Sequence, residues 1–179
     1  LHVPNQGFGP ALLLVHGFPL DHSMWRHQIR QFAGKYRVLA PDLRGFGASD
    51  VSSGVVTMED FADDMAALLD ALRIDKAVFC GLSMGGYIAF QFAKNYPDRL
   101  AGLILCDTRA VPDSPEAAQN REALAAKVLK EGTAELANDM LKKLFAPATL
   151  EAGGEDVATM RAVMANAGPE GVAAALRGM

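Results

Sequence analysis

Long hydrophobic runs and clusters of like charge are both missing from this sequence. No apolar stretch approaches the roughly 20 residues that cross a membrane, and the N-terminal residues lack the basic and apolar pattern of a secretory signal. The net charge is −4, and the 17 Lys and Arg residues are scattered along the chain. These absences favour neither membrane insertion nor nucleic-acid binding as a function.

Cysteine is scarce, and the sequence contains only Cys80 and Cys106. Each ends an apolar run that is typical of a buried strand, so we expect two buried free thiols. A disulfide between parallel neighbouring strands is the alternative. Free thiols fit a reducing compartment, and a cytoplasmic location is therefore predicted.

Histidine is confined to the first 27 residues, as His2, His16, His22 and His27. His22 and His27 lie on or beside a predicted short helix, and no acidic or cysteine partner falls at metal-ligand spacing near them. We therefore predict neither a metal site nor an organic cofactor.

Short apolar runs alternate with helical patterns over residues 1–111. The predicted strands cover 11–15, 36–40, 76–80 and 100–105, and the predicted helices between them cover 23–33, 57–72 and 87–96. Continuous apolar runs are typical of strands that are buried on both faces. This alternation predicts an α/β fold, a parallel sheet with helices on both faces. Ser23 and Thr57 are the expected N-caps, and Asp60 completes a capping-box pattern with Thr57.

The remainder of the chain contains only helical patterns. They cover about 116–131, 133–145, 155–167 and 169–177, with abundant alanine and no β-branched runs. We therefore predict a second, all-helical unit over residues 112–179. Its methionines recur at helical spacing and are expected to form its core, although contact with a substrate is an alternative.

The stretch from Val78 to Gly86 carries the clearest functional signal. An apolar run leads into Gly81-Leu82-Ser83-Met84-Gly85, and a helical pattern follows directly. Such a strand, tight turn and helix is typical of a nucleophile elbow, which exposes one hydroxyl, here that of Ser83. The stretch lacks the Lys-Ser/Thr of a P-loop and does not match the Gly-x-Gly-x-x-Gly of dinucleotide-binding proteins.

A serine nucleophile requires a general base and two preorganised donors for the developing oxyanion. The backbone amide of Met84, next to Ser83, is one candidate donor. The other is the amide of Phe18 in the loop His16-Gly17-Phe18-Pro19, where Gly17 permits a close approach of the backbone.

Three motifs together resemble the α/β-hydrolase fold family. They are His16-Gly17-Phe18-Pro19, the loop from Asp42 to Ser49, and Gly81-Leu82-Ser83-Met84-Gly85-Gly86. Cys106-Asp107-Thr108-Arg109-Ala110 resembles the branch of 3-oxoadipate enol-lactonase-like hydrolases and related esterases. The resemblance covers 11–109, and it implies a hydrolase core (1–111) under a helical cap (112–179).

The resemblance also implies the chemistry. Ser83 would attack a small carboxylic ester or lactone and form an acyl-enzyme, with Phe18 and Met84 as the oxyanion hole. Because the family places its acid and then its histidine after the serine, and no histidine follows Ser83, we expect both groups beyond residue 179. The chain would then be the N-terminal portion of a larger hydrolase, and we expect its own N-terminal end to be incomplete as well. A related acyl chemistry such as peracid formation is not distinguished by these motifs.

The alternative is a hydrolase-like binding module, or an inactive fragment, that keeps the pocket without the chemistry. If residues beyond 179 are absent, the strand at 100–105 would leave an unpaired apolar edge, which favours pairing with a second copy or with a missing C-terminal segment.

Other candidate residues each have a less specific interpretation. His16 is either a substitute general base or a residue that shapes its loop through hydrogen bonds. Asp107 follows a strand, where it is either a catalytic acid or a turn-forming or Arg-pairing residue. Asp42 and Arg44 are expected to hold their loop by hydrogen bonds. Trp25 is a candidate lining residue of the substrate pocket, and simple packing is its alternative.

Overall fold

A mostly parallel sheet forms the centre of the molecule, a computed structural model that describes residues 1–52 and 54–179. Its strands are β1 (Asn5–Gln6), β2 (Ala11–Val15), β3 (Arg37–Leu39), β4 (Ala77–Leu82) and β5 (Leu100–Cys106), in the order β1-β3-β2-β4-β5. β1 is antiparallel to β3, whereas the other neighbours are parallel. The predicted α/β sheet is confirmed, and the short β1 is an additional strand that precedes the first predicted one.

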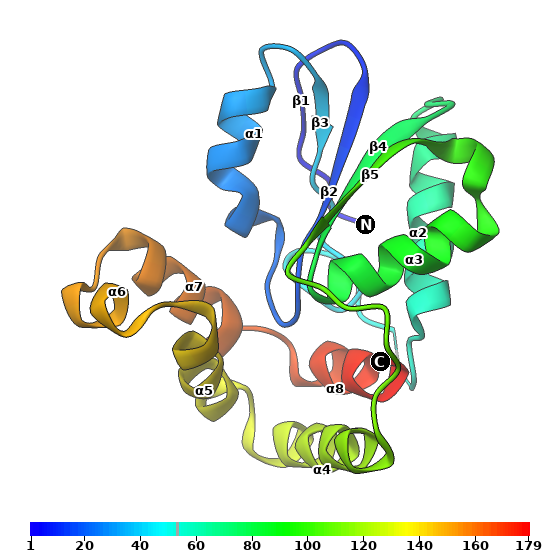
Figure 1. The fold of residues 1–179 in the computed structure, drawn as a ribbon. Coiled ribbons are helices and arrows are strands. Elements are labelled where there is room, and N and C mark those ends of the chain that lie inside the picture. The colour runs from blue at the N-terminus through cyan, green and yellow to red at the C-terminus, as the bar shows by residue number, and fades with distance from the viewer. Residues whose placement is uncertain (53) are drawn as a thin grey trace.

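Helices cover both faces of this sheet (Figure 1). α1 (Arg26–Phe32) packs on one face, and α2 (Met58–Ala71) and α3 (Met84–Asn95) pack on the other. Alternate β2 residues separate the two layers, since Leu12 and Leu14 join the α1 cluster while Leu13 and Val15 join the larger one. Two 3-10 turns, His22–Trp25 and Pro97–Arg99, complete this part of the fold.

The helix starts agree only in part with the sequence patterns. The capping box of α2 is confirmed, because Thr57 Oγ1 accepts from the Asp60 amide and the Asp60 carboxylate accepts from the Thr57 amide. The prediction for Ser23 is wrong. The cap there is Asp21, whose carboxylate accepts from the Ser23 amide at 2.9 Å. Either side chain is a good N-cap, so the sequence alone did not separate them.

The helical part consists of α4 (Pro115–Glu131), α5 (Ala134–Leu144), α6 (Pro147–Ala152), α7 (Glu155–Ala165) and α8 (Pro169–Gly178). The short α6 was not predicted, because six residues give too little periodicity. α5 and α7 form a small core together with Leu20. Leu141 of α5 and Met160 and Met164 of α7 are among its buried residues. None of the helices in the described part of the chain has the length and apolar character needed to cross a membrane.

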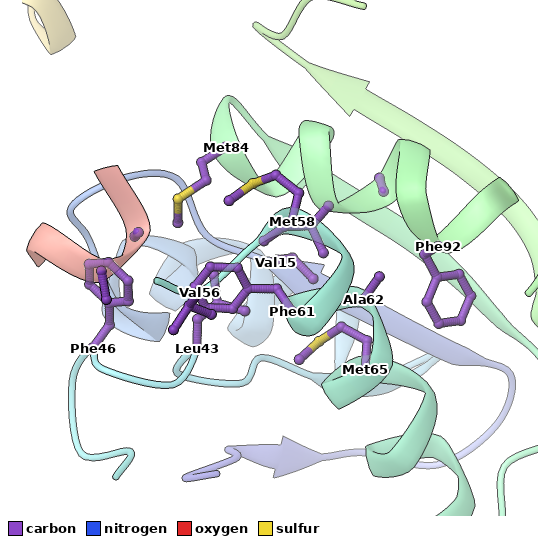
Figure 2. Packing of buried hydrophobic residues seen from close by; sticks show 14 of the residues in the cluster. Val15, Leu43, Phe46, Val56, Met58, Phe61, Ala62, Met65, Met84 and Phe92 are labelled. Carbon is purple, nitrogen blue, oxygen red and sulfur yellow. The ribbon is translucent and has the colours of Figure 1, made fainter. Parts of the chain in front are cut away.

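α8 returns to the core of the sheet layer instead of staying with α5 and α7. Its Val172 and Leu176 belong to the same buried cluster as Phe46 and Phe61, and Figure 2 shows Phe46 beside this helix. The backbone of α8 touches the backbone of the loop after β3 at Gly171 and Gly45. A Cβ on Gly171 would overlap the carbonyl oxygen of Gly45, a residue that itself has a φ of +84°. The boundary predicted at 111/112 remains a prediction, since α8 shares its core with the sheet layer.

The thiols of Cys80 and Cys106 are free and lie side by side on β4 and β5, with their Sγ atoms 3.9 Å apart. Burial, together with the neighbouring thiol, raises the pKa of Cys80 to about 12. The thiol is therefore protonated at neutral pH. The expected free thiols are present, and the side-by-side placement that a disulfide would need is present as well.

We predict that Gly171→Ala destabilises the protein by roughly 1–3 kcal/mol, the usual cost of overpacking a core. Alanine would otherwise favour a helix by about 0.5–1 kcal/mol over glycine. Here the new methyl group meets a backbone carbonyl that no side-chain rotation can move. The measurement is the urea midpoint. Gly34→Ala is the control, because a Cβ there meets nothing within 4 Å. An unchanged midpoint in Gly171→Ala would contradict the contact between α8 and the core.

We also predict that β5 makes the 179-residue chain self-associate. β5 is an edge strand in the described sheet, and its Leu103, Ile104 and Leu105 are exposed. Such edges pair with other chains, and lysine on an edge prevents this. Ile104→Lys should therefore shift the species in sedimentation velocity toward the monomer. Leu129→Lys is the matched control, because Leu129 on α4 and Ile104 are both 45% exposed. A monomeric wild-type chain would refute the prediction.

Candidate functional site

The turn between β4 and α3 holds Ser83 in a backbone conformation that is rare for a residue with a side chain. Its φ is +50° and its ψ is −110°. Such a conformation costs on the order of 1–3 kcal/mol and persists only where the surroundings enforce it. The half-buried Ser83 lies between the last residue of a strand and the first residue of a helix, as predicted for a nucleophile elbow.

Three glycines make this turn sterically feasible. A Cβ on Gly81 would overlap the Gly85 carbonyl, and one on Gly85 would overlap the carbonyl of Val15 at the end of β2. A Cβ on Gly86 would overlap the side chain of Thr108. The turn is thus packed against the ends of both neighbouring strands, β2 and β5.

Two hydrogen bonds from the end of β5 fix the backbone of Ser83. Its amide donates to the Cys106 carbonyl at 2.9 Å, and its carbonyl accepts from the Thr108 hydroxyl at 2.8 Å. Thr108 belongs to the Cys106-Asp107-Thr108-Arg109-Ala110 motif after the fourth strand, but the sequence did not predict its contact with Ser83, which spans 25 residues.

The loop after β2 approaches the elbow closely at Gly17. A Cβ on Gly17 would lie 3.4 Å from the Cβ of Ser83 and 3.3 Å from the Leu82 carbonyl oxygen. Phe18 and Met84 therefore flank the serine, from this loop and from the first residue of α3. Neither amide donates a hydrogen bond within the described residues. Two amide donors beside Ser83 are the arrangement that an oxyanion hole requires.

Ser83 opens into a cleft of about 490 Å³ between the sheet layer and the cap helices. Phe18 and Tyr87 line it from the core, and α4, α5 and α8 supply the opposite wall. The apolar residues of that wall are Leu124, Val128, Leu136, Met140, Leu176 and Met179. Arg121, Lys127 and Glu135 from α4 and α5 are among its charged lining residues. The size and apolar lining suit a small, partly apolar molecule.

His16 is fully buried, and its ring is committed to structure. The amide of Leu43 donates to Nε2 at 3.0 Å, so Nδ1 carries the proton and donates to the Gly17 carbonyl at 3.0 Å. Burial lowers the pKa of His16, against the opposing effect of the Gly17 hydrogen bond. The imidazole is therefore neutral and has no free lone pair, which supports loop shaping over a role as base.

The other histidines have acidic partners that the sequence did not reveal. His22 Nδ1 lies 2.7 Å from Asp42 Oδ1, and His27 Nε2 lies 3.2 Å from Asp156 Oδ1. The sequence shows no acidic partner at ligand spacing for either histidine, and these pairs were not predicted because they join residues 20 and 129 positions apart. His2 approaches the first pair, so that His2, His22 and Asp42 offer ligand atoms within 4.8 Å of one another.

The remaining candidates take structural positions. Asp42 and Arg44 hold their loop as expected, since Asp42 accepts from the Ala48 amide and Arg44 pairs with Asp64 of α2. Asp107 follows β5 with a φ of +39°, a turn conformation, and Asp113 is the acid that pairs with Arg109.

Trp25 is 6% exposed and packs between α1 and the sheet, away from the residues that line the cleft. This position agrees with packing, which was the alternative to the predicted contact with substrate.

The fold, the elbow and the cleft define a class of protein. Residues 10–144 match the family described as alpha/beta hydrolase fold, and the chain belongs to this family.

The individual relatives are hydrolases. The chain is 34% identical to 3-oxoadipate enol-lactonase 2 of Acinetobacter baylyi over 94% of its own length and 62% of the lactonase. It matches the structure of a thermophilic esterase from Thermogutta terrifontis, solved with malate bound, at a TM-score of 0.96 and 50% identity. That match covers 99% of this chain and 65% of the esterase. Epoxide hydrolase 2 of Siraitia grosvenorii is 40% identical over 58% of this chain and 34% of the enzyme. The chain thus spans less than two thirds of each of these proteins.

The neutral His16 predicts a pH dependence of stability. Its folded-state pKa is lowered, so between that pKa and about 6.5 the unfolded chain binds a proton that the folded chain does not. Stability should therefore fall as pH falls below about 6.5. His16→Gln retains an acceptor for the Leu43 amide but has no group that titrates in this range. Its free energy of unfolding should therefore fall by up to about 1 kcal/mol less than that of wild type between pH 7.5 and 5.5. Urea midpoints at the two pH values measure the difference, and equal losses in both proteins would contradict a neutral His16.

Proposed function

We propose that this chain is the core and cap of a serine hydrolase that cleaves a small carboxylic ester or lactone. The observation that carries the proposal is the placement of Ser83, a serine held at a strained turn on the floor of a largely apolar cleft. A structural role would not require a hydroxyl at this point, because the hydrogen bonds that hold the turn use the backbone of Ser83.

In the proposed reaction Ser83 Oγ attacks the carbonyl carbon of the substrate. A general base takes the hydroxyl proton, and the negative charge develops on the carbonyl oxygen. The amides of Phe18 and Met84 then donate to that oxygen. As the intermediate collapses, the protonated base gives its proton to the leaving oxygen, so that the alcohol is released and an acyl-enzyme remains. A water molecule, activated by the same base, releases the acid and restores the serine. The chain's own residues need no metal or organic cofactor for these steps.

The general base is proposed to lie outside residues 1–179. Within the described residues, no histidine hydrogen-bonds to the Ser83 hydroxyl, His16 has both ring nitrogens engaged, and His22 and His27 pair with carboxylates. The histidine and the acid that orients it are therefore expected in a further segment or in a partner chain. The two free thiols fit a cytoplasmic location, which is part of the proposal.

An ester or lactone is preferred over an epoxide for two reasons. The lactonase and the esterase align over nearly the whole chain, including the helices that line the cleft, whereas the epoxide hydrolase aligns over 58% of it. In addition, a serine that forms an acyl-enzyme acts on a carbonyl group, which esters and lactones supply and epoxides lack.

A binding module that keeps this cleft without chemistry is the second candidate. The observation that favours it is the absence of a base beside Ser83 in the described part of the chain. The two candidates differ in what the hydroxyl does. In the hydrolase it forms a covalent bond, and in the module its loss leaves ligand affinity unchanged.

The deciding measurement is intact mass before and after a fluorophosphonate probe, with ester turnover measured in parallel. The hydrolase proposal predicts stoichiometric labelling of wild type, no labelling of Ser83→Ala, and a loss of turnover on the order of 10³-fold or more. The unlabelled mass also shows whether the protein is the 19.0 kDa chain or a longer one.

Ser23→Ala is the control, because Ser23 lies in the turn before α1 and does not line the cleft. It should label and turn over substrate like wild type. An unlabelled protein that is larger than 19.0 kDa would overturn the hydrolase proposal and favour the binding module, whereas an unlabelled 19.0 kDa chain would simply lack the base that the proposal places outside residues 1–179.

A further inference from the structure

A second cavity lies between the loops that follow β2 and β3 and the C-terminal half of α7. Its volume is about 420 Å³, and it shares no lining residue with the Ser83 cleft. Asp21, His22 and Asp42 line it from the core, and Ala162, Val163 and Asn166 line it from the cap. No Lys or Arg is among its described lining residues. Two carboxylates without a cationic side chain make this cavity attractive to a cation.

Three potential metal ligands converge at this place. Asp42 Oδ1 lies 2.7 Å from His22 Nδ1, and the rings of His22 and His2 have centroids 5.2 Å apart. One ligand atom from each of the three residues falls within 4.8 Å of the other two. Ligand atoms about 2.1 Å from a tetrahedral Zn²⁺ are about 3.4 Å apart. His22 Nδ1 and Asp42 Oδ1 are already closer than this, and the His2 ligand atom lies within 4.8 Å of both, so small side-chain movements would complete the set.

Asp42 is held rigidly, which reduces the cost of assembling a site. The carboxylate is fully buried, and its Oδ1 accepts from the His22 amide at 2.8 Å while Oδ2 accepts from the Ala48 amide at 3.0 Å. Hydrogen bonds of this kind orient a ligating carboxylate.

The backbone of His2 is also fixed, and its side chain is left available. Its amide donates to Ser49 Oγ at 2.8 Å, and its carbonyl accepts from the Asp42 amide at 2.9 Å. The backbones of His2 and Asp42 are therefore hydrogen-bonded to each other, and the imidazole of His2 projects from a defined position.

We propose that His2, His22 and Asp42 bind a divalent transition-metal ion such as Zn²⁺. The ion replaces the hydrogen bond between His22 Nδ1 and Asp42 Oδ1, which move slightly apart to hold it, and the His2 ring supplies the third ligand. Two imidazoles and one carboxylate favour Zn²⁺, Co²⁺ or Ni²⁺ over Mg²⁺ or Ca²⁺, which prefer oxygen ligands alone. Water or Asn166 in the cavity would complete the coordination. The role of the ion is structural, because it ties the N-terminal segment to the loops that position His16 and Gly17.

The test titrates Zn²⁺ into the metal-free protein by calorimetry, and Co²⁺ into the same protein by visible absorption. Wild type should bind one equivalent with a micromolar Kd. His2→Ala and His22→Ala should each bind at least about tenfold more weakly, since each removes one of three ligands. Excess Zn²⁺ should also raise the melting temperature of wild type by more than that of His2→Ala, because an ion that binds only the folded chain stabilises it in proportion to how tightly it binds.

His27→Ala is the matched control. His27 is also hydrogen-bonded to an aspartate, but both partners are exposed and the described residues include no third ligand near them. It should bind Zn²⁺ like wild type. Because the His2 side chain makes no hydrogen bond among the described residues, His2→Ala should fold, and circular dichroism will verify this. Wild-type binding that is absent at 1 mM Zn²⁺, or equal binding by wild type and both variants, would overturn the proposal.

Discussion

The left-handed backbone at Ser83 is the constraint on which the rest of the site depends. It requires the ends of three strands to meet at one point, because the turn touches Val15 at the end of β2 and is hydrogen-bonded to Cys106 at the end of β5. The parallel register of β2, β4 and β5 brings these ends together. The sheet therefore does more than support the serine. It holds the turn in a conformation that an isolated strand, turn and helix would not retain.

The sequence predicted features in which neighbouring residues carry the physical cause. The sheet followed from runs that are apolar at successive positions, and the start of α2 followed from Thr57 and Asp60, three residues apart. The elbow was recognisable for the same reason, because the glycines that permit it stand within three residues of Ser83. Where two neighbouring residues were equally suitable, as Asp21 and Ser23 were at the first 3-10 turn, the sequence did not decide between them.

These local patterns did not predict contacts between residues that are far apart in the sequence. The pairing of His22 with Asp42 spans 20 positions, and the bond from Thr108 to Ser83 spans 25. The position of α8 was hidden for a related reason. Its alanine-rich pattern is compatible with any helical environment, and only the approach of Gly171 to Gly45 shows that it packs against the sheet layer. Trp25 shows a different limit. An aromatic residue near a functional loop can line the substrate pocket or fill the core, and Trp25 packs in the core beside α1.

The two roles of α8 have a consequence for how this cleft can change during evolution. Leu176 and Met179 shape one wall of the cleft, yet the same helix fills the centre of the main core. A change of shape on that wall is therefore coupled to folding. α4 and α5 contribute Val128 and Leu136 to the same core, but both helices also present an exposed outer surface while they line the cleft from within. Divergence toward new substrates should accumulate on α4 and α5, and α8 should remain nearly constant.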